Sequence, residues 1–184
     1  MTAMPIDLYG RPFTRDTLGE VPDDGHRYEV VDGSLLVTPA PSRSHQRAAF
    51  RMARLLDDAC PPDLEVIIAP FEVVLDDQTA VQPDVLVARR ADLGERDLQR
   101  TPLLVVEVVS PHTRRVDRML KWSRYEAAGV PAYWVVEPDV PSVTAWVLSD
   151  GRYAEVGQAR GEEPFEGEAP FPVRVVPEQL VADR

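Results

Sequence analysis

Two acidic residues lie in apolar stretches of the sequence where buried strands are expected. Glu107 interrupts the otherwise apolar run from Leu103 to Val109, and Asp84 follows Pro83 in the stretch 81–90. A buried carboxylate without a partner costs on the order of several kcal/mol. A structural ion pair or a solvated strand end would explain Glu107, and a strand-end turn would explain Asp84. A cation bound between the two would explain both residues at once.

Residue alternation along the two expected strands places these carboxylates relative to their neighbours. One face of the later strand carries Leu103, Val105, Glu107 and Val109. One face of the earlier strand carries Asp84, Leu86 and Ala88. If the strands are neighbours, Asp84 and Glu107 meet on one surface, where they repel each other unless a cation lies between them. Mg²⁺ or Mn²⁺ suits such a site, because hard divalent ions prefer carboxylate and water oxygens.

The elements that would position these residues can be predicted from turn signals and hydrophobic patterns. We expect two hairpins, at 27–39 around Asp32-Gly33 and at 143–156 around Asp150-Gly151. We expect two helices, from Ser42 or Ser44 to about Asp58 and at 114–128. Strands are expected at 64–76 (bent at Pro70), 81–90, 101–110 and 131–138, with a polar loop at 91–100. Strand, helix and strand between 101 and 138 predict a βαβ unit with parallel strands and a right-handed connection. The expected fold class is α/β (mixed α+β), with a central mixed β-sheet flanked by helices.

The chain is expected to form a single domain over residues 1–184. Its composition, 44% hydrophobic and 28% charged, is typical of a globular protein long enough to bury a core. Residues 157–184 are rich in Gly, Glu and Pro, which predicts an irregular acidic tail with one short strand at 171–176. We expect no membrane helix, because no apolar run approaches the roughly 20 residues needed, and no signal peptide. The single cysteine, Cys60, excludes an internal disulfide framework and favours a cytoplasmic location.

The charge of the chain is acidic overall but unevenly distributed. A net charge of −11 counts against a protein that coats nucleic acid, because phosphate binding relies on Lys and Arg. Residues 43–54 nevertheless carry four arginines and no acid, and residues 112–124 carry five Lys or Arg against Asp117 alone. The arginines at 43, 47, 51 and 54 recur at helical spacing. Such a stripe is typical of a solvated helix face, and the alternative is a surface that follows phosphates.

Several short motifs resemble, in their order along the chain, those of the Uma-type family of predicted restriction endonucleases. They are Arg27–Gly33, His45, Gln82–Val85, Val106–Pro111, Asp117, Lys121, Tyr125, Gly129-Val130 and Tyr133-Trp134. Each piece is weak alone, and the specificity lies in the combination. The resemblance covers about residues 26–148. This family belongs to the PD-(D/E)XK nuclease superfamily.

The resemblance implies a restriction-endonuclease-like core over residues 26–148, with added N-terminal and C-terminal β-hairpins. It implies Mg²⁺-dependent phosphodiester hydrolysis, with Asp84, Glu107 and Val108 as metal ligands. The superfamily pattern expects a lysine two residues after the acid, but Val109 occupies that position. In Uma-type relatives the following helix is expected to supply the lysine, which here gives Lys121 as a catalytic residue. Glu29 is implied as a further catalytic acid near the metal.

Other positions carry two interpretations each. A helical projection predicts a core-facing stripe of Val116, Met119, Leu120, Ser123 and Ala127. Lys121 lies off that stripe, so it either faces solvent or reaches over the end of the sheet toward the metal. Glu29, taken alone, would be an exposed strand residue. His45 would cap or pack at the start of its helix, with phosphate binding or general-base chemistry as the alternative.

The predicted substrate-binding residues are His45, Arg43, Arg47, Ser110, Arg114, Arg118 and Tyr125. Ser110 lacks the G-x-S-x-G turn that a serine nucleophile needs. Together these features predict an endonuclease that uses Mg²⁺ or Mn²⁺ and acts on DNA. Because one such site cuts one strand, cutting both strands would favour a homodimer. The acidic charge and Val109 favour a rival hypothesis, a non-catalytic nucleic-acid-binding or assembly protein that retains the fold. A hydrolase acting on another substrate is a third hypothesis.

Overall fold

The computed structural model describes residues 12–21, 24–109 and 120–183 of the chain. The strands are β1 (Arg27–Val31), β2 (Ser34–Thr38), β3 (Leu64–Ile68), β4 (Glu72–Asp76), β5 (Thr79–Val81), β6 (Val85–Arg89), β7 (Asp97–Leu98), β8 (Leu104–Val108), β9 (Ala132–Glu137), β10 (Ser142–Ser149), β11 (Arg152–Arg160), β12 (Phe165–Gly167) and β13 (Val173–Val175). The helices are α1 (Arg15–Leu18), α2 (Arg43–Ala59), α4 (Trp122–Ala127) and α5 (Pro177–Val181), with a 3-10 turn, η2, at Arg90–Asp92. None of the helices in these residues is long and apolar enough to cross a membrane.

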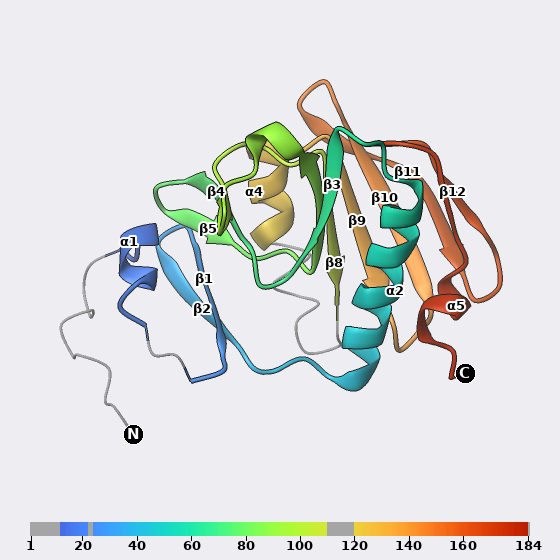
Figure 1. Cartoon of the computed structure of the whole chain (residues 1–184), viewed down its shortest axis with the longest axis horizontal. Coiled ribbons are helices and arrows are strands. Elements are labelled where there is room, and N and C mark those ends of the chain that lie inside the picture. The colour runs from blue at the N-terminus through green and yellow to red at the C-terminus, as the bar shows by residue number, and fades with distance from the viewer. Residues whose placement is uncertain (1–11, 22–23, 110–119, 184) are drawn as a thin grey trace.

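Two β-sheets form the framework of the molecule (Figure 1). The central sheet has six strands in the order β11-β10-β9-β8-β6-β3, and the second has five in the order β2-β1-β5-β4-β7. In the central sheet β8 and β9 are parallel, as the βαβ pattern predicted, and the other pairs are antiparallel. The hairpin predicted around Asp32-Gly33 is also confirmed. Its two turn residues have φ angles of 51° and 70°, the left-handed conformation that a two-residue hairpin turn requires.

Two apolar cores lie on opposite faces of the central sheet. On one face, α2 buries Ala48, Met52 and Leu56 against Val85, Val87, Leu104 and Val106. On the other face, α4 and the second sheet bury Tyr125, Val31, Val73 and Val81 against Leu86, Val105 and Tyr133. Because both faces are covered, the four buried residues of β6 are all apolar, and β8 is apolar apart from Glu107.

The predicted strands at 64–76 and 81–90 are each two strands that belong to different sheets. The chain leaves the central sheet between β3 and β4 and returns to it between β5 and β6. We call residues 69–71 and 82–84 the two sheet crossings. Pro70 and Pro83 stand at these crossings, where a residue without an N–H can interrupt a strand ladder. The Ala69 N–H donates to the Asp84 carbonyl at 3.2 Å, so the crossings lie side by side where the two sheets separate.

The segment from residue 157 is more regular than the predicted irregular tail with one strand. β11 continues to Arg160, and β12, β13 and α5 follow it. Phe165, Phe171, Val175 and Leu180 are buried in the core beneath α2. The prediction was wrong because it weighed the Gly, Glu and Pro content. Tertiary packing of a few widely spaced apolar side chains outweighs such local preferences.

Candidate functional site

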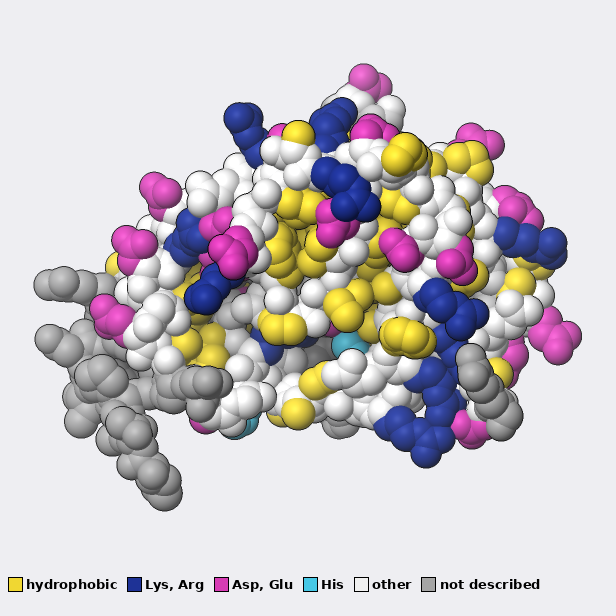
Figure 2. Space-filling view, in the orientation of Figure 1, with side chains coloured by type: hydrophobic (Ala, Val, Ile, Leu, Met, Phe, Trp, Pro, Cys, Tyr) yellow, Lys and Arg dark blue, Asp and Glu magenta, His cyan; other side chains and the backbone are white. Residues whose placement is uncertain are grey.

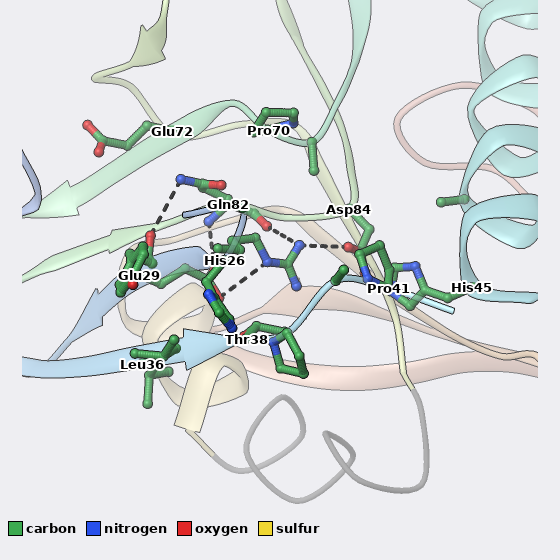
Figure 3. A pocket seen from close by; sticks show the side chains of 18 of the residues that line it. His26, Glu29, Leu36, Thr38, Pro41, His45, Pro70, Glu72, Gln82 and Asp84 are labelled. Carbon is green, nitrogen blue, oxygen red and sulfur yellow. Dashed lines mark hydrogen bonds and ion pairs between the residues drawn. The ribbon is translucent and has the colours of Figure 1, made fainter. Parts of the chain in front are cut away.

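A cleft of about 1320 Å³ opens beside the sheet crossings. Side chains from β1, β2, both crossings and the first turns of α2 line it, together with Lys121. In Figure 3, Glu29 lies on one side of the cleft, Asp84 and His45 lie on the other, and Gln82 lies between them. Acidic and basic side chains from three separate parts of the fold therefore converge on one cavity.

Asp84, at the second crossing, is held by three donors. Arg27 Nη1 donates to Asp84 Oδ1 at 2.9 Å, and the Val108 backbone N–H donates to Oδ2 at 2.8 Å. His45 Nε2 lies 3.2 Å from the same Oδ2. Burial raises the pKa of Asp84, but the contacts with His45 and Arg27 outweigh burial and lower the pKa to about 2. Asp84 is therefore an ionised carboxylate at neutral pH.

Lys121 joins two acids that come from different sheets. Its Nζ donates to Glu29 Oε1 at 2.8 Å and lies 3.4 Å from Glu107 Oε1. All three side chains are only 1% exposed. The Gln82 backbone N–H also donates to Glu29 Oε1, at 2.7 Å. Lys121 is the single lysine of the sequence, all other Lys or Arg positions being arginine. A compact ammonium suits a narrow buried position better than a planar guanidinium does.

The strand register brings Asp84 and Glu107 to the same end of one strand pair. β6 and β8 are antiparallel neighbours, with Val85 opposite Val106, so continuing the register by one residue sets Asp84 opposite Glu107. The hydrogen bond from Val108 to Asp84 ties the acid to the residue that follows Glu107. The two strands therefore pair, which is the condition on which the expected shared surface for Asp84 and Glu107 depended.

Arg27 lies among the carboxylates, and sequence reasoning assigned it no role. Burial lowers its pKa, but the charges of Asp84, Glu29 and Glu107 outweigh burial and raise the Arg27 pKa above its ordinary value. Three buried carboxylates thus face the two side chains of Arg27 and Lys121. One signal was present in the sequence. Arg27 and Glu29 are two residues apart, so they share a face of β1, and the apolar residues after them mark that strand as buried.

The helical projection was wrong at two positions in the described part of the predicted helix 114–128, although Leu120 packs against the core as predicted. Ser123 and Ala127, assigned to the core-facing stripe, are exposed, whereas Lys121 and Tyr125 are buried. The projection counts only hydrophobicity and therefore directs a lysine toward solvent. Here acids on two strands receive the ammonium, which offsets the loss of its hydration. The same contacts bury Glu29, which taken alone had been expected on the surface.

Tyr125 does not line the cleft among the described residues, although it was predicted to bind substrate. It is completely buried and donates its hydroxyl to Glu107 Oε1 at 2.8 Å. Burial and the Glu107 charge raise the pKa of Tyr125 well above its usual value. The phenol therefore stays protonated and acts as a fixed donor to the acid.

The arginine stripe of α2 contacts the C-terminal segment rather than the cleft. Arg47 Nη1 donates to the Val181 carbonyl at 2.7 Å, and Arg51 Nη1 donates to the Gln179 and Ala182 carbonyls, both at 2.8 Å. Arg43 and Arg47 also form ion pairs with Asp183 at 2.9 and 2.6 Å. Basic side chains accordingly gather over α2 and α5 (Figure 2). These arginines satisfy carbonyls at the end of α5.

The other predicted substrate-binding residues divide into two groups. His45 lines the cleft beside Asp84, and its backbone N–H is capped by Ser42 Oγ at 3.2 Å. Ser110, Arg114 and Arg118 lie outside the described residues. Of the predicted substrate-binding set, the described structure thus brings His45 alone to the cleft.

Changing Tyr125 to Phe should destabilise the fold through Glu107. The buried carboxylate would lose a donor, and hydrogen bonds to charged groups contribute about 1.5–3 kcal/mol. We expect a loss of that size in the free energy of unfolding, measured by urea denaturation. Tyr153→Phe is the matched control, because its hydroxyl donates to the neutral Val130 carbonyl at 2.9 Å and is only partly buried. Equal losses in the two variants would contradict a special role for the bond to Glu107.

Comparisons with known proteins agree with the fold. The sequence model of the Uma2 family, described as "Putative restriction endonuclease", matches residues 16–178. A crystal structure described as "a putative nuclease belonging to DUF820 from Anabaena variabilis ATCC 29413" superposes with a TM-score of 0.70 at 16% identity, covering 92% of this chain and 98% of that chain. A search of curated proteins finds no match. The structural likeness confirms the expected fold class, a mixed α/β protein with a restriction-endonuclease-like core.

Proposed function

Because the chain belongs to the Uma2 family of restriction-endonuclease-like proteins, we propose that it is a divalent-metal-dependent endonuclease that hydrolyses phosphodiester bonds in DNA. The observation that carries the proposal is the buried cluster of Asp84, Glu107, Glu29 and Lys121 at a cleft. Burying three carboxylates and a lysine together is costly for stability. Asp84, whose pKa its partners lower, is a perturbed group of the kind that gathers at functional sites.

The oxygen atoms of the cluster fit Mg²⁺ or Mn²⁺. Within the described residues no three His, Cys, Asp or Glu side chains are grouped as a ready metal cage. The ion would therefore draw on Asp84, Glu107, the backbone carbonyl of Val108 and water, a mixed shell that Mg²⁺ commonly keeps. When bound, such an ion polarises the phosphate and lowers the pKa of the attacking water.

The remaining polar groups have separate roles in this proposal. Lys121 supplies the positive charge that the strand lacks at Val109, and it stabilises charge that develops on the phosphate. Glu29 holds the Lys121 ammonium in position. His45, next to Asp84 at the cleft, orients that carboxylate and contacts the substrate backbone.

The rival proposal is a nucleic-acid-binding or assembly protein without cleavage activity. Two observations favour it: the net charge of −11, and the engagement of Arg43 and Arg47 with the C-terminal segment. Both reduce the positive surface available for phosphates. The two proposals differ in a single measurable property, whether DNA is cut.

Cleavage assays with the full chain should separate these proposals. We expect supercoiled plasmid and short oligonucleotides to be cut with Mg²⁺ or Mn²⁺ and to stay intact with EDTA. An Asp84→Asn protein purified in the same way controls for contaminating nucleases. Cleavage that survives EDTA, or that the control preparation shares, would contradict the proposal. Nicking without linear product would indicate one site acting alone, and linear product would favour a homodimer.

A further inference from the structure

Arg27 is placed between the candidate metal ligands and the open cleft. Its Nη1 donates to Asp84 Oδ1 at 2.9 Å and to the Gln82 carbonyl at 3.2 Å, and its Nε lies 3.9 Å from Glu29 Oε2. The side chain is 21% exposed, whereas Asp84 is 4% and Glu29 is 1% exposed. Arg27 therefore reaches both the buried acids and the solvent of the cavity.

A divalent cation on Asp84 and the Arg27 guanidinium compete for the same place. Both need Oδ1 of a carboxylate whose Oδ2 already accepts from the Val108 N–H and lies near His45. They are also like charges, which repel strongly at contact distance in a partly buried site. A metal bound to Asp84 would therefore displace the guanidinium from that oxygen.

A displaced Arg27 would remain at the cleft. Its strand position in β1 is fixed by pairing with β2, where Arg27 lies opposite Thr38. The Gln82 carbonyl is a second acceptor that a metal on Asp84 does not remove. A guanidinium matches the oxygens of a phosphate, because its N–H groups form a planar fork.

Other basic side chains at the cleft are less suited to this role. Lys121 is 1% exposed and held by Glu29 and Glu107. Arg15 also lines the cleft, but it is paired with Glu72 at 2.6 Å and with Asp97. Arg27 differs from both, because a metal could replace it at Asp84 and because its side chain reaches the cavity.

We propose that Arg27 is a phosphate-binding residue that exchanges partners: its guanidinium neutralises Asp84 without metal, and it binds a substrate phosphate oxygen once a divalent cation takes Asp84. The inference rests on the proposed function, because it needs both the metal and a phosphodiester substrate. It assigns the cleft a specific charged contact with the DNA backbone, which the arginines of α2, held by the C-terminal segment, do not provide.

Two binding measurements on the full chain test the exchange. Mn²⁺ titration without nucleic acid should show about tenfold tighter binding in Arg27→Gln, because the competing charge is gone. Binding of a short fluorescent DNA oligonucleotide, with Ca²⁺ filling the site, should weaken in the same variant, and the slope of log affinity against log salt should fall by about one. Structural damage would weaken the binding of both Mn²⁺ and DNA. Tighter Mn²⁺ binding together with weaker DNA binding therefore identifies the exchange.

Matched variants make each outcome decisive. Arg15→Gln should leave Mn²⁺ affinity unchanged, and Arg27→Lys, which keeps the charge, should bind Mn²⁺ like the parent but DNA less tightly. Unchanged or weaker Mn²⁺ binding in Arg27→Gln overturns the exchange. If that variant does not fold, parental DNA affinity in Arg27→Lys overturns it instead. A parent that binds no Mn²⁺, or binds it equally after Asp84→Asn, overturns the metal site and with it both proposals.

Discussion

Glu107→Gln should abolish metal-dependent cleavage while the protein stays folded. Glutamine keeps the shape of the side chain and can still accept from Tyr125, but it removes the negative charge that would hold the cation. Losing one preorganised electrostatic contact in an active site lowers rates by on the order of 10²–10³-fold, and a lost metal ligand should cost at least as much. The rate of plasmid nicking at saturating Mg²⁺ measures the effect.

The control for this prediction is a carboxylate outside the cluster. Glu65 lies on β3, pairs with Arg90 at 2.7 Å and is 36% exposed, so Glu65→Gln should cleave like the parent. Circular dichroism and the urea midpoint establish that Glu107→Gln is folded. Cleavage by Glu107→Gln within a few-fold of the parent would refute its role as a ligand. Glu107 would then be a structural partner of Lys121 and Tyr125.

Lys121→Ala should both destabilise the protein and stop cleavage. The ammonium is the buried partner of Glu29 and Glu107, and removing one member of a buried ion pair costs about 3–5 kcal/mol. We expect a loss of this size in urea denaturation. At temperatures where the variant remains folded, the cleavage rate should still be strongly reduced, because the charge acts in the transition state. Lys121→Arg should recover only part of the stability and part of the cleavage rate, because the planar guanidinium is wider than the ammonium.

A second substitution separates the two effects of Lys121. In the Lys121→Ala background, Glu29→Gln removes the carboxylate closest to the lost ammonium and should restore part of the stability. It should restore no cleavage. If cleavage returns together with stability, Lys121 acts only as a structural counter-charge. If Lys121→Ala unfolds no more easily than the parent, the buried contacts with Glu29 and Glu107 are themselves wrong.

The sequence allowed the two strands that carry the acids to be predicted, because local patterns specify them, but it left open whether they pair. A proline before Asp84, an apolar run around Glu107 and residue alternation placed the two carboxylates on one surface only under the condition that the strands are neighbours, which the structure meets. The hairpin at Asp32-Gly33 and the parallel pair of β8 and β9 followed from turn chemistry and element order in the same way.

The parts that were missed depend on contacts between distant segments. The stretches 64–76 and 81–90 are apolar on both sides of their prolines. The bend predicted at Pro70 therefore did not reveal that the chain changes sheets there, and again at Pro83. Arg27 meets Asp84 across 57 positions of sequence, and Lys121 meets Glu29 across 92. A charged side chain can be buried only where a partner of opposite charge is present. A hydrophobicity scale contains no information about such partners, so it cannot predict this burial.

The burial of Lys121 also determines how the whole protein responds to amine chemistry. It is the single lysine in the sequence, and 1% of its side chain is exposed. The folded chain therefore offers acylating reagents no accessible lysine side chain. Any acetyl group found on Lys121 reports a molecule in which the ion pairs with Glu29 and Glu107 were open when the reagent arrived. The fraction of Lys121 that is acylated, measured by mass spectrometry, therefore reports how often these ion pairs open, and no label has to be introduced.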